Sequence, residues 1–475
     1  MSTTAPAAGE RLSLPAVLTF SLSGLPVASL IVGLGIFLQP YIAIHLGVGL
    51  TMVGFAWGAV RLIDIPIDPV LGVMMDRTHT PLGRYRVWLI VGAPILMLGV
   101  YMMFNAQRGI GPAYLIGWLL VMYLGISILG LAQSAWGAVI APNYHERSRV
   151  FGVLAMVGVV GMLLVLTIPA LAGAGQAAAD RAVPLMGWFV VIATPLCVAI
   201  VAWRTPEKVS RPVPGVGTRF NLGDYAGLAT KPTMVRLLLA EFAIVLGTGW
   251  MTALYLFFFR DSRHFSQSQA SVLLGVYILS GLVGAPTTAW VATRIGKHRT
   301  MMAATTAYSI GLCTVLMIPK GVVLGAVPTM LWCGFMASGF SLMTRAMIAD
   351  VGDEVRLEQG KERISLIYAL LGLTTKVSGA MASLIAYPLL DAVGYHAKEA
   401  LKNSPEAVRH MEVVYLAGPT LLVLFGGACF IGWKLDEQQH GEIRAELDAR
   451  DALYAEAPIT ESLTGQAAIP LVEPG

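Results

Sequence analysis

The sequence predicts an all-α polytopic membrane protein in which twelve transmembrane helices form two six-helix halves. Three observations support this fold class: the composition, the spacing of long apolar segments, and an internal repeat. Of the 475 residues, 56% are hydrophobic and 13% are charged, and the mean hydropathy is +0.71. This charged fraction is about half that of an average soluble domain. We therefore expect the lipid bilayer to surround the protein, and we expect no nucleic-acid partner.

Apolar segments long enough to cross a bilayer recur along the chain. They lie at residues 16–44, 50–75, 87–105, 112–141, 150–174, 184–204, 233–259, 268–293, 300–318, 322–349, 364–394 and 410–433. The chain then divides into an N-terminal half (1–204), a central loop (205–232), a C-terminal half (233–434) and a tail (435–475). The central loop is charged and rich in Pro and Gly, and the tail predicts a short charged helix followed by a disordered end.

The basic residues predict the orientation of the chain in the membrane. Placing the N-terminus inside assigns 21 Lys or Arg to cytoplasmic segments, 8 to outer loops and 3 to spans. Because cytoplasmic loops carry an excess of Lys and Arg, both termini and the central loop are predicted to be cytoplasmic. The residues before Arg11 are small and polar and do not resemble a signal peptide. The expected location is the plasma membrane, which in a bacterium is the inner membrane.

A repeat relates the two halves. The motif Gly83-Arg84-Tyr85-Arg86 follows span 2, and Gly296-Lys297-His298-Arg299 follows span 8, an offset of 213 residues. Glu146-Arg147 precedes span 5 and Glu362-Arg363 precedes span 11, an offset of 216 residues. Two matches at nearly one offset indicate a duplicated six-helix unit. Such an architecture places a substrate site between the halves, near the middle of the membrane.

Three ionisable residues interrupt the second span. Arg61, Asp64 and Asp68 are spaced three and four apart, so helix periodicity puts them on one face. Each costs roughly 3 kcal/mol at mid-membrane, or on the order of 9 kcal/mol together before pairing. They must therefore face the protein interior or water. A structural Arg–Asp pair explains one acid but leaves the second without a purpose, so an ion site is the better hypothesis.

Three stretches resemble a known family. They are the run Arg61 to Trp88, the run Met347 to Glu354 with Gly360-Lys361-Glu362-Arg363 and Lys376, and Trp136 with Glu146-Arg147. They are similar to the glycoside-pentoside-hexuronide:cation symporters of the major facilitator superfamily, the family of melibiose permease. The resemblance covers both halves, and the first stretch is the most specific. It implies the major facilitator fold and cation-coupled transport of a small organic solute by alternating access.

The resemblance also assigns the ion site. It implies that Asp64 and Asp68 bind the coupling cation, with Arg61 and Lys376 as charge partners. A bound cation would then replace the Lys376 amine, so that loading changes which helices are held together. Sodium-coupled members carry Asn one position before the second acid, where this chain has Ile67. A proton needs only one carboxylate, so H⁺ is favoured, with Na⁺ as the alternative coupling ion.

The expected substrate site departs from that of melibiose permease. The sugar-binding acids of that permease align with Ala28 and Ala132, and alanine accepts no hydrogen bond from a hydroxyl. A less hydroxylated solute, or different ligands, is therefore expected. The candidate ligands are Gln39, Gln133, Ser134, Trp136, Trp250 and Tyr255. The same signature occurs in lysolipid carriers, so an amphipathic cargo is the alternative to a glycoside.

Charged residues near the predicted cytoplasmic loops form a second group. We expect them to close the cytoplasmic side of the pathway. They are Asp76, Arg77, Arg84, Arg86, Arg294, Lys297, Arg299, Asp350 and Asp353.

A polytopic membrane enzyme and a sensor without transport activity are the rival classes. No HExxH, GxGD or GxSxG element occurs, and the eight histidines fall in predicted loops or at helix ends. We therefore expect a non-enzyme with no cofactor and no metal site. The four cysteines lie in apolar runs and are expected to be packed thiols. The resemblance implies a monomer, and retention of both acids and of Lys376 argues against a sensor.

Overall fold

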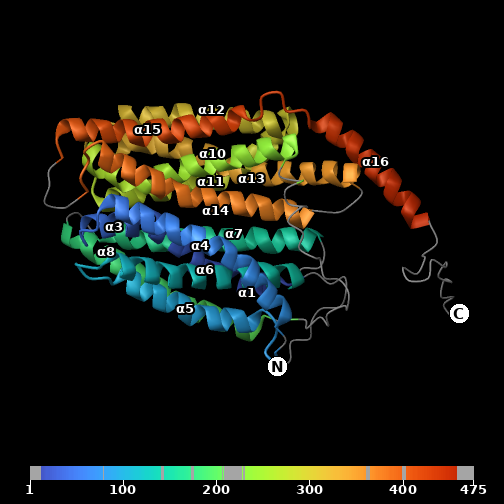
Figure 1. Cartoon of the computed structure of the whole chain (residues 1–475), viewed down its shortest axis with the longest axis horizontal. Coiled ribbons are helices and arrows are strands. Elements are labelled where there is room, and N and C mark those ends of the chain that lie inside the picture. Colours follow the sequence, from blue (N-terminus) through green and yellow to red (C-terminus); the bar gives the residue numbers. More distant parts are fainter. Residues whose placement is uncertain are drawn as a thin grey trace.

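The structure is a computed structural model. It describes residues 12–78, 80–140, 144–172, 176–205, 207, 227, 230–359, 364–397 and 403–456. These residues form helices and turns, and they contain no strand. The helices lie side by side with nearly parallel axes, those of the N-terminal half on one side of the bundle and those of the C-terminal half on the other (Figure 1). The predicted all-α architecture is confirmed.

Twelve segments of the described chain are long and apolar enough to cross a membrane, as predicted. The first half contains α1 (Leu14–Ser21), α2 (Gly24–Val32), η1 (Gly33–Leu38), α3 (Gln39–Ile44), α4 (Leu50–Arg77), α5 (Arg86–Phe104), α6 (Pro112–Ile140), α7 (Tyr144–Leu171) and α8 (Gln176–Arg204). The second half contains α10 (Pro232–Phe257), η2 (Phe258–Ser262), α11 (Gln267–Ile295), α12 (Lys297–Cys313), η3 (Thr314–Met317), η4 (Val323–Ala326), α13 (Val327–Gln359), α14 (Ile364–Ala392) and α15 (Pro405–Ala428). The tail forms α16 (Glu437–Glu456). The first span combines α2, η1 and α3.

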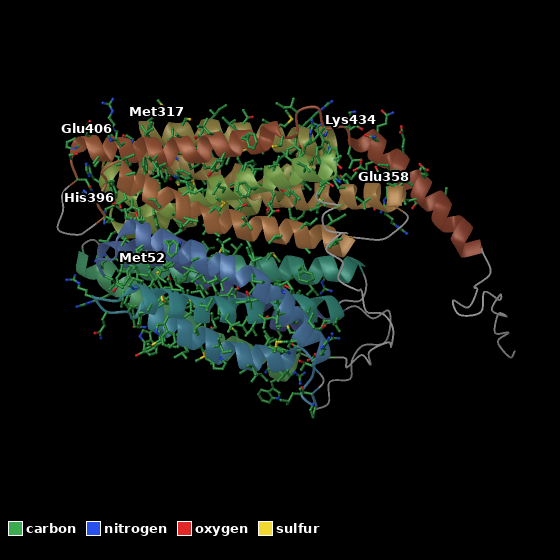
Figure 2. All side chains as sticks on the ribbon, viewed as in Figure 1. Met52, Met317, Glu358, His396, Glu406 and Lys434 are labelled. Atoms are coloured by element: carbon green, nitrogen blue, oxygen red, sulfur yellow. The ribbon has the colours of Figure 1, made fainter. Side chains whose placement is uncertain are left out.

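The bundle has two ends that we name by what they carry. The tail end is the one from which α16 extends, and Glu358 and Lys434 lie there (Figures 1 and 2). The far end carries Met52, Met317, His396 and Glu406 (Figure 2). Most of the predicted central loop lies outside the described residues, as do Glu362-Arg363 of the repeat and the side chains of Glu146-Arg147. The tail is described as far as residue 456.

The glycines of the repeated motif occupy matching backbone positions. Gly83 precedes α5 with φ of +119°, and Gly296 precedes α12 with φ of +87°, a region that favours glycine. At Gly83 a Cβ would also lie 2.1 Å from Oε2 of Glu207. That carboxylate accepts the backbone N–H groups of Arg84, Tyr85 and Arg86 at 2.7, 2.6 and 3.1 Å. Glu207 therefore caps the start of α5, where a helix has free N–H groups.

Small residues and hydrogen bonds hold the two halves together toward the far end. There α4 packs against α14, and a Cβ at Gly54 would lie 2.5 Å from the carbonyl oxygen of Ser383. The Ser383 hydroxyl donates to Oε1 of Gln39 at 2.8 Å. The Thr51 hydroxyl donates to Oδ2 of Asp391 at 3.0 Å. Close backbone approach of this kind is typical of packed membrane helices.

The described cysteines carry free thiols. Cys197 and Cys333 are buried and Cys429 is half-buried, as expected of packed thiols. Cys313 is exposed at the end of α12, so the prediction of a packed thiol is wrong there. The reason is that a membrane helix is apolar on its outer face too, so an apolar run does not identify a buried residue.

Replacing Gly54 with alanine should weaken the contact between the halves. The added Cβ has no room against Ser383, and overpacking of this kind typically costs about 1–3 kcal/mol. The matched control is Gly72→Ala on the same helix, where a Cβ meets nothing within 4 Å. Thermal unfolding of the purified protein should give a lower Tm for Gly54→Ala and an unchanged or higher Tm for Gly72→Ala. Equal shifts would contradict this packing.

Candidate functional site

Two carboxylates of α4 share one amine from α14. Nζ of Lys376 lies 2.7 Å from Oδ2 of Asp64 and 2.5 Å from Oδ2 of Asp68. The two acids are four residues apart, so helix geometry brings both to the same partner. These contacts join a helix of the N-terminal half to a helix of the C-terminal half. The structure thus brings together three of the four residues predicted for the cation site.

Asp64 is the more enclosed of the two acids. It is 1% exposed, and the hydroxyl of Ser127 on α6 donates to its Oδ1 at 2.9 Å. The side chains of Asp68 and Lys376 are 25% and 23% exposed. Oδ1 of Asp68 is buried and has no hydrogen-bond partner among the described residues. Both oxygens of Asp64 therefore have hydrogen-bond partners, whereas Oδ1 of Asp68 has none among the described residues.

Two prolines flank Asp68 in the same helix. Pro66 and Pro69 lie inside α4, which continues through both of them. Proline has no N–H, so the carbonyl groups of Leu62 and Ile65 lose their usual donors four residues on. In a membrane such freed groups are tolerated where protein or water can bond to them. The backbone around the acid pair is therefore unusually polar for a membrane helix.

Arg61 does not pair with either carboxylate among the described ion pairs. Its guanidinium lies over the ring of Tyr123 on α6, 4.7 Å from the ring centroid. This is cation–π geometry, in which the ring face attracts the positive charge. Arg61 thus forms no direct ion pair with these acids among the described residues, because Lys376 occupies them and Tyr123 offers an alternative, and its role as a charge partner stays a prediction. Trp57, one turn before Arg61, is buried with its Nε1 unpaired.

The two predicted glutamine ligands are buried and engaged with other side chains. Gln39 is 5% exposed and accepts the hydroxyl of Ser383, which lies in the other half. Gln133 is 8% exposed and donates from Nε2 to Oγ of Ser23 at 2.6 Å. Both amides therefore have structural hydrogen bonds in this state. Their role as substrate ligands stays a prediction.

The aromatic candidates are spread along the bundle. Trp136 is fully buried, in edge contact with Phe20 and with the Arg86 guanidinium 5.8 Å from its ring. Trp250 is 7% exposed, and Tyr255 donates its hydroxyl to the carbonyl oxygen of Ala270 at 2.9 Å. The remaining candidate, Ser134 on α6, is exposed. The role of these residues as substrate ligands, like that of the two glutamines, stays a prediction.

The predicted gate charges of the N-terminal half bond close to their own helix ends. Nε of Arg84 donates to the carbonyl oxygen of Met75 at 3.1 Å, and Nη2 of Arg86 donates to that of Thr205 at 2.7 Å. Arg77 is exposed, and the side chain of Asp76 lies outside the described residues. Each of these bonds joins segments of one half. They fix the tail end of α4, α5 and α8 to one another.

The gate charges of the C-terminal half form a second cluster at the tail end. Nζ of Lys297 lies 2.7 Å from Oδ1 of Asp350, which joins α12 to α13. Arg294 lies over the ring of Trp290, 5.2 Å from its centroid, and Arg299 is exposed. This pairing also stays within one half.

The tail helix docks on the same acids. His440 of α16 places Nε2 3.0 Å from Oδ2 of Asp353 and 3.5 Å from Oδ1 of Asp350. Nε of Arg444 lies 3.5 Å from Oδ2 of Asp353. Leu447, which is fully buried, lies on the same face of α16 as these residues. The sequence predicted the charged helix but gave no sign that it binds the end of α13.

Sequence reasoning also missed Ser127 and Glu207. A single serine in an apolar span and a single glutamate in a charged loop carry no distinguishing pattern. The described residues contain no cluster of three or more His, Cys, Asp or Glu side chains suited to a metal ion.

Comparison with known proteins shows which proteins this chain resembles. A family profile described as "MFS/sugar transport protein" matches residues 19–437. The isoprimeverose transporter of Lactiplantibacillus pentosus is 23% identical over 425 residues, which are 85% of this chain and 87% of that protein. The sodium-dependent lysophosphatidylcholine symporter 1 of Gallus gallus is 22% identical over 493 residues, 92% and 90% of the two chains. The crystal structure of the nucleoside transporter NupG has a TM-score of 0.64 at 12% identity, covering 89% of this chain and all of that chain.

The bundle of two six-helix halves therefore defines a membrane transporter with the major facilitator fold rather than an enzyme. The profile covers most of the sequence and both acids on α4. The chain belongs to the MFS/sugar transport protein family.

Removing the two basic side chains of α16 should release this helix from α13. In the double variant His440→Ala and Arg444→Ala, Asp353 loses both partners, so amide hydrogen exchange in residues 437–449 should speed up several-fold. Surface ion pairs contribute about 1 kcal/mol or less each, which sets this modest size. The control is Glu446→Ala, an exposed position of the same helix. Unchanged exchange in the double variant would show that these contacts do not hold the helix.

Proposed function

We propose that the protein is a proton-coupled symporter of a small organic solute that works by alternating access. The observation that carries this proposal is the amine of Lys376 shared by Asp64 and Asp68 across the two halves. Two carboxylates and one ammonium leave a net charge of −1 in a largely buried place. One bound proton or monovalent cation makes the set neutral.

Asp68 is the acid that the proton reaches first. Its side chain is partly exposed and its Oδ1 is unpaired, whereas both oxygens of Asp64 are engaged by Lys376 and Ser127. When Asp68 takes up a proton it loses its negative charge and its attraction for the lysine. Lys376 then keeps one charged partner instead of two, and the bond between α4 and α14 weakens.

A proton suits this site better than sodium. The side-chain oxygens gathered here come from Asp64, Asp68 and Ser127, and Ile67 supplies none. Hard cations bind through several oxygen ligands, whereas a proton needs one carboxylate. The sodium alternative remains worth testing, because one relative is named a sodium-dependent symporter.

Two classes of cargo have support among the relatives. The isoprimeverose transporter points to a glycoside, and the lysophosphatidylcholine symporter points to an amphipathic lipid. Ala132 is fully buried, and Ala28 packs with its Cβ toward Gly158, so neither position offers a polar ligand. We propose a glycoside-like solute as the cargo. A lysolipid is the second candidate, favoured by these two apolar positions.

The tail end of the bundle is proposed to face the cytoplasm. The basic residues are concentrated in loops at that end, as the distribution of charge in membrane proteins requires. The halves are hydrogen-bonded at the far end by Thr51 with Asp391 and by Ser268 with Ala170, whereas at the tail end Lys297 with Asp350 and Arg86 with Thr205 each join segments of one half. We infer an inward-facing monomer in the plasma membrane.

Uptake into proteoliposomes tests both coupling and cargo. Isoprimeverose, lactose and lysophosphatidylcholine are first compared in a thermal-shift assay, because a ligand that binds the folded state raises its Tm. The sugar should raise Tm and should be accumulated under an inward pH gradient. A sodium gradient of equal size should drive no accumulation. Accumulation driven by sodium alone would contradict proton coupling.

Replacing Asp68 with asparagine should separate coupling from movement of the solute. The amide cannot take up a proton, so accumulation against a gradient should be lost while exchange of solute across the membrane persists. Glu406→Gln removes an exposed acid at the far end and serves as the control, with accumulation unchanged (Figure 2). If the Asp68→Asn variant still accumulates solute against its gradient, Asp68 is not part of the coupling site.

A further inference from the structure

A second buried acid lies outside the Lys376 site. Glu241 on α10 is 7% exposed and nine residues after Pro232, about 13.5 Å along the helix from its start at the tail end. Such a depth lies within the apolar part of a bilayer. An ionised carboxylate there is costly unless it is paired. Its surroundings therefore decide its charge.

The polar contacts of Glu241 are neutral. The hydroxyl of Thr375 on α14 donates to its Oε1 at 2.9 Å, and the hydroxyl of Thr344 on α13 lies nearby. No ion pair of Glu241 occurs among the described residues. Arg236, one helical turn earlier, instead donates to the carbonyl oxygens of Ile431 and Gly432.

The charged groups that face Glu241 are few. Arg345 on α13 is the cation close enough to act on it electrostatically, and its side chain is exposed. Lys376 follows Thr375 on α14 and is held by the two acids of α4. From α15 it is Gly426 that packs against Ala240 and Ile244, while the charged residues of α15 lie toward the far end. Neither η1 nor α3 carries a charged residue, and those of η2 lie at the far end.

The two hydroxyls already have acceptors. The Thr375 hydroxyl lies 3.0 Å from the carbonyl oxygen of Leu371, and the Thr344 hydroxyl lies 3.0 Å from that of Phe340. Each hydroxyl has one proton and can give it to its own helix. The Thr375 hydroxyl therefore divides its one proton between Leu371 and Oε1 of Glu241, and neither hydroxyl brings a positive charge to the acid. A buried acid whose partners are neutral is less costly as a protonated carboxyl than as a carboxylate.

We propose that Glu241 is a second proton-binding site of the transporter, located in the C-terminal half. The inference rests on the proposed proton coupling and extends it from one site to two. In this conformation the carboxyl holds its proton, and its Oε1 accepts the hydroxyl of Thr375. When it releases that proton to water at the tail end, the carboxylate attracts Arg345, which remains a cation. The ion pair that then forms draws α13 toward α10.

Infrared spectroscopy of the full-length protein in liposomes tests the protonation directly, without a substrate. A protonated carboxyl has a carbonyl-stretch band that is separate from the bands of carboxylates. At neutral pH this band should be present in the wild type and lost in Glu241→Gln. It should persist in the double variant Asp64→Asn and Asp68→Asn. A difference spectrum that shows a lost carboxylate band instead would overturn the proposal.

A second variant covers the case in which Glu241→Gln does not fold. Thr375→Val keeps the acid and removes one hydrogen-bond partner, so the same band should shift to higher frequency. An unshifted band in Thr375→Val would assign the signal to another group and would overturn the proposal. These spectra measure protonation without transport. The Glu241 proposal can therefore fail or succeed independently of the uptake experiment.

Thermal unfolding against pH gives a separate measure. If the folded state favours the neutral form of Glu241, the contribution of this group to the free energy of unfolding is fully present at low pH. That contribution falls as the pH rises and the proton is lost. The fall in Tm should be smaller in Glu241→Gln, whose amide cannot ionise, and unchanged in the control Glu406→Gln. Identical Tm profiles for Glu241→Gln and the wild type would contradict a titrating group at this position.

Discussion

The ammonium of Lys376 held between Asp64 and Asp68 is the interaction on which the arrangement of the halves depends. In a low-dielectric interior, breaking such a pair by removing one partner leaves a charge uncompensated at a cost of about 3–5 kcal/mol. Protonation avoids that cost, because the acid becomes neutral as it releases the amine. A proton can therefore change the contact between α4 and α14 without leaving a bare charge.

The other contacts between the halves are weak enough to break and form again. Toward the far end, α4 meets α14 through Gly54 and the hydrogen bond of Thr51, and α3 meets α14 through the hydrogen bond of Gln39. These are short, neutral or exposed contacts, each worth about 1 kcal/mol. No single one of them outweighs the buried charges. In the proposed mechanism, the charge set therefore decides which end of the bundle is closed.

Much of the fold could be predicted from hydrophobicity and repetition. The spans follow from apolar length, and the repeat predicted the correspondence of Gly83 and Gly296, which both have a positive φ. The acid pair on α4 was evident because charge is rare in such a segment. The partners of these residues were not evident: Ser127 is one hydroxyl among many, and Arg61 faced a choice between carboxylate and aromatic ring that only packing decides.

The docking of α16 was unpredictable for a related reason, since one exposed charged helix looks like another until its partner is known. The position of α16 matters for the proposed cycle because α13 carries both Arg345, near Glu241, and the acids to which α16 binds. Arg345 lies five residues before Asp350, about 7.5 Å along the same helix. Asp350 is bound by Lys297, and Asp353 by His440 and Arg444. In the proposed cycle, attraction of Arg345 by Glu241 would act on the helix that anchors the tail, and would connect this buried acid to the tail end of the bundle.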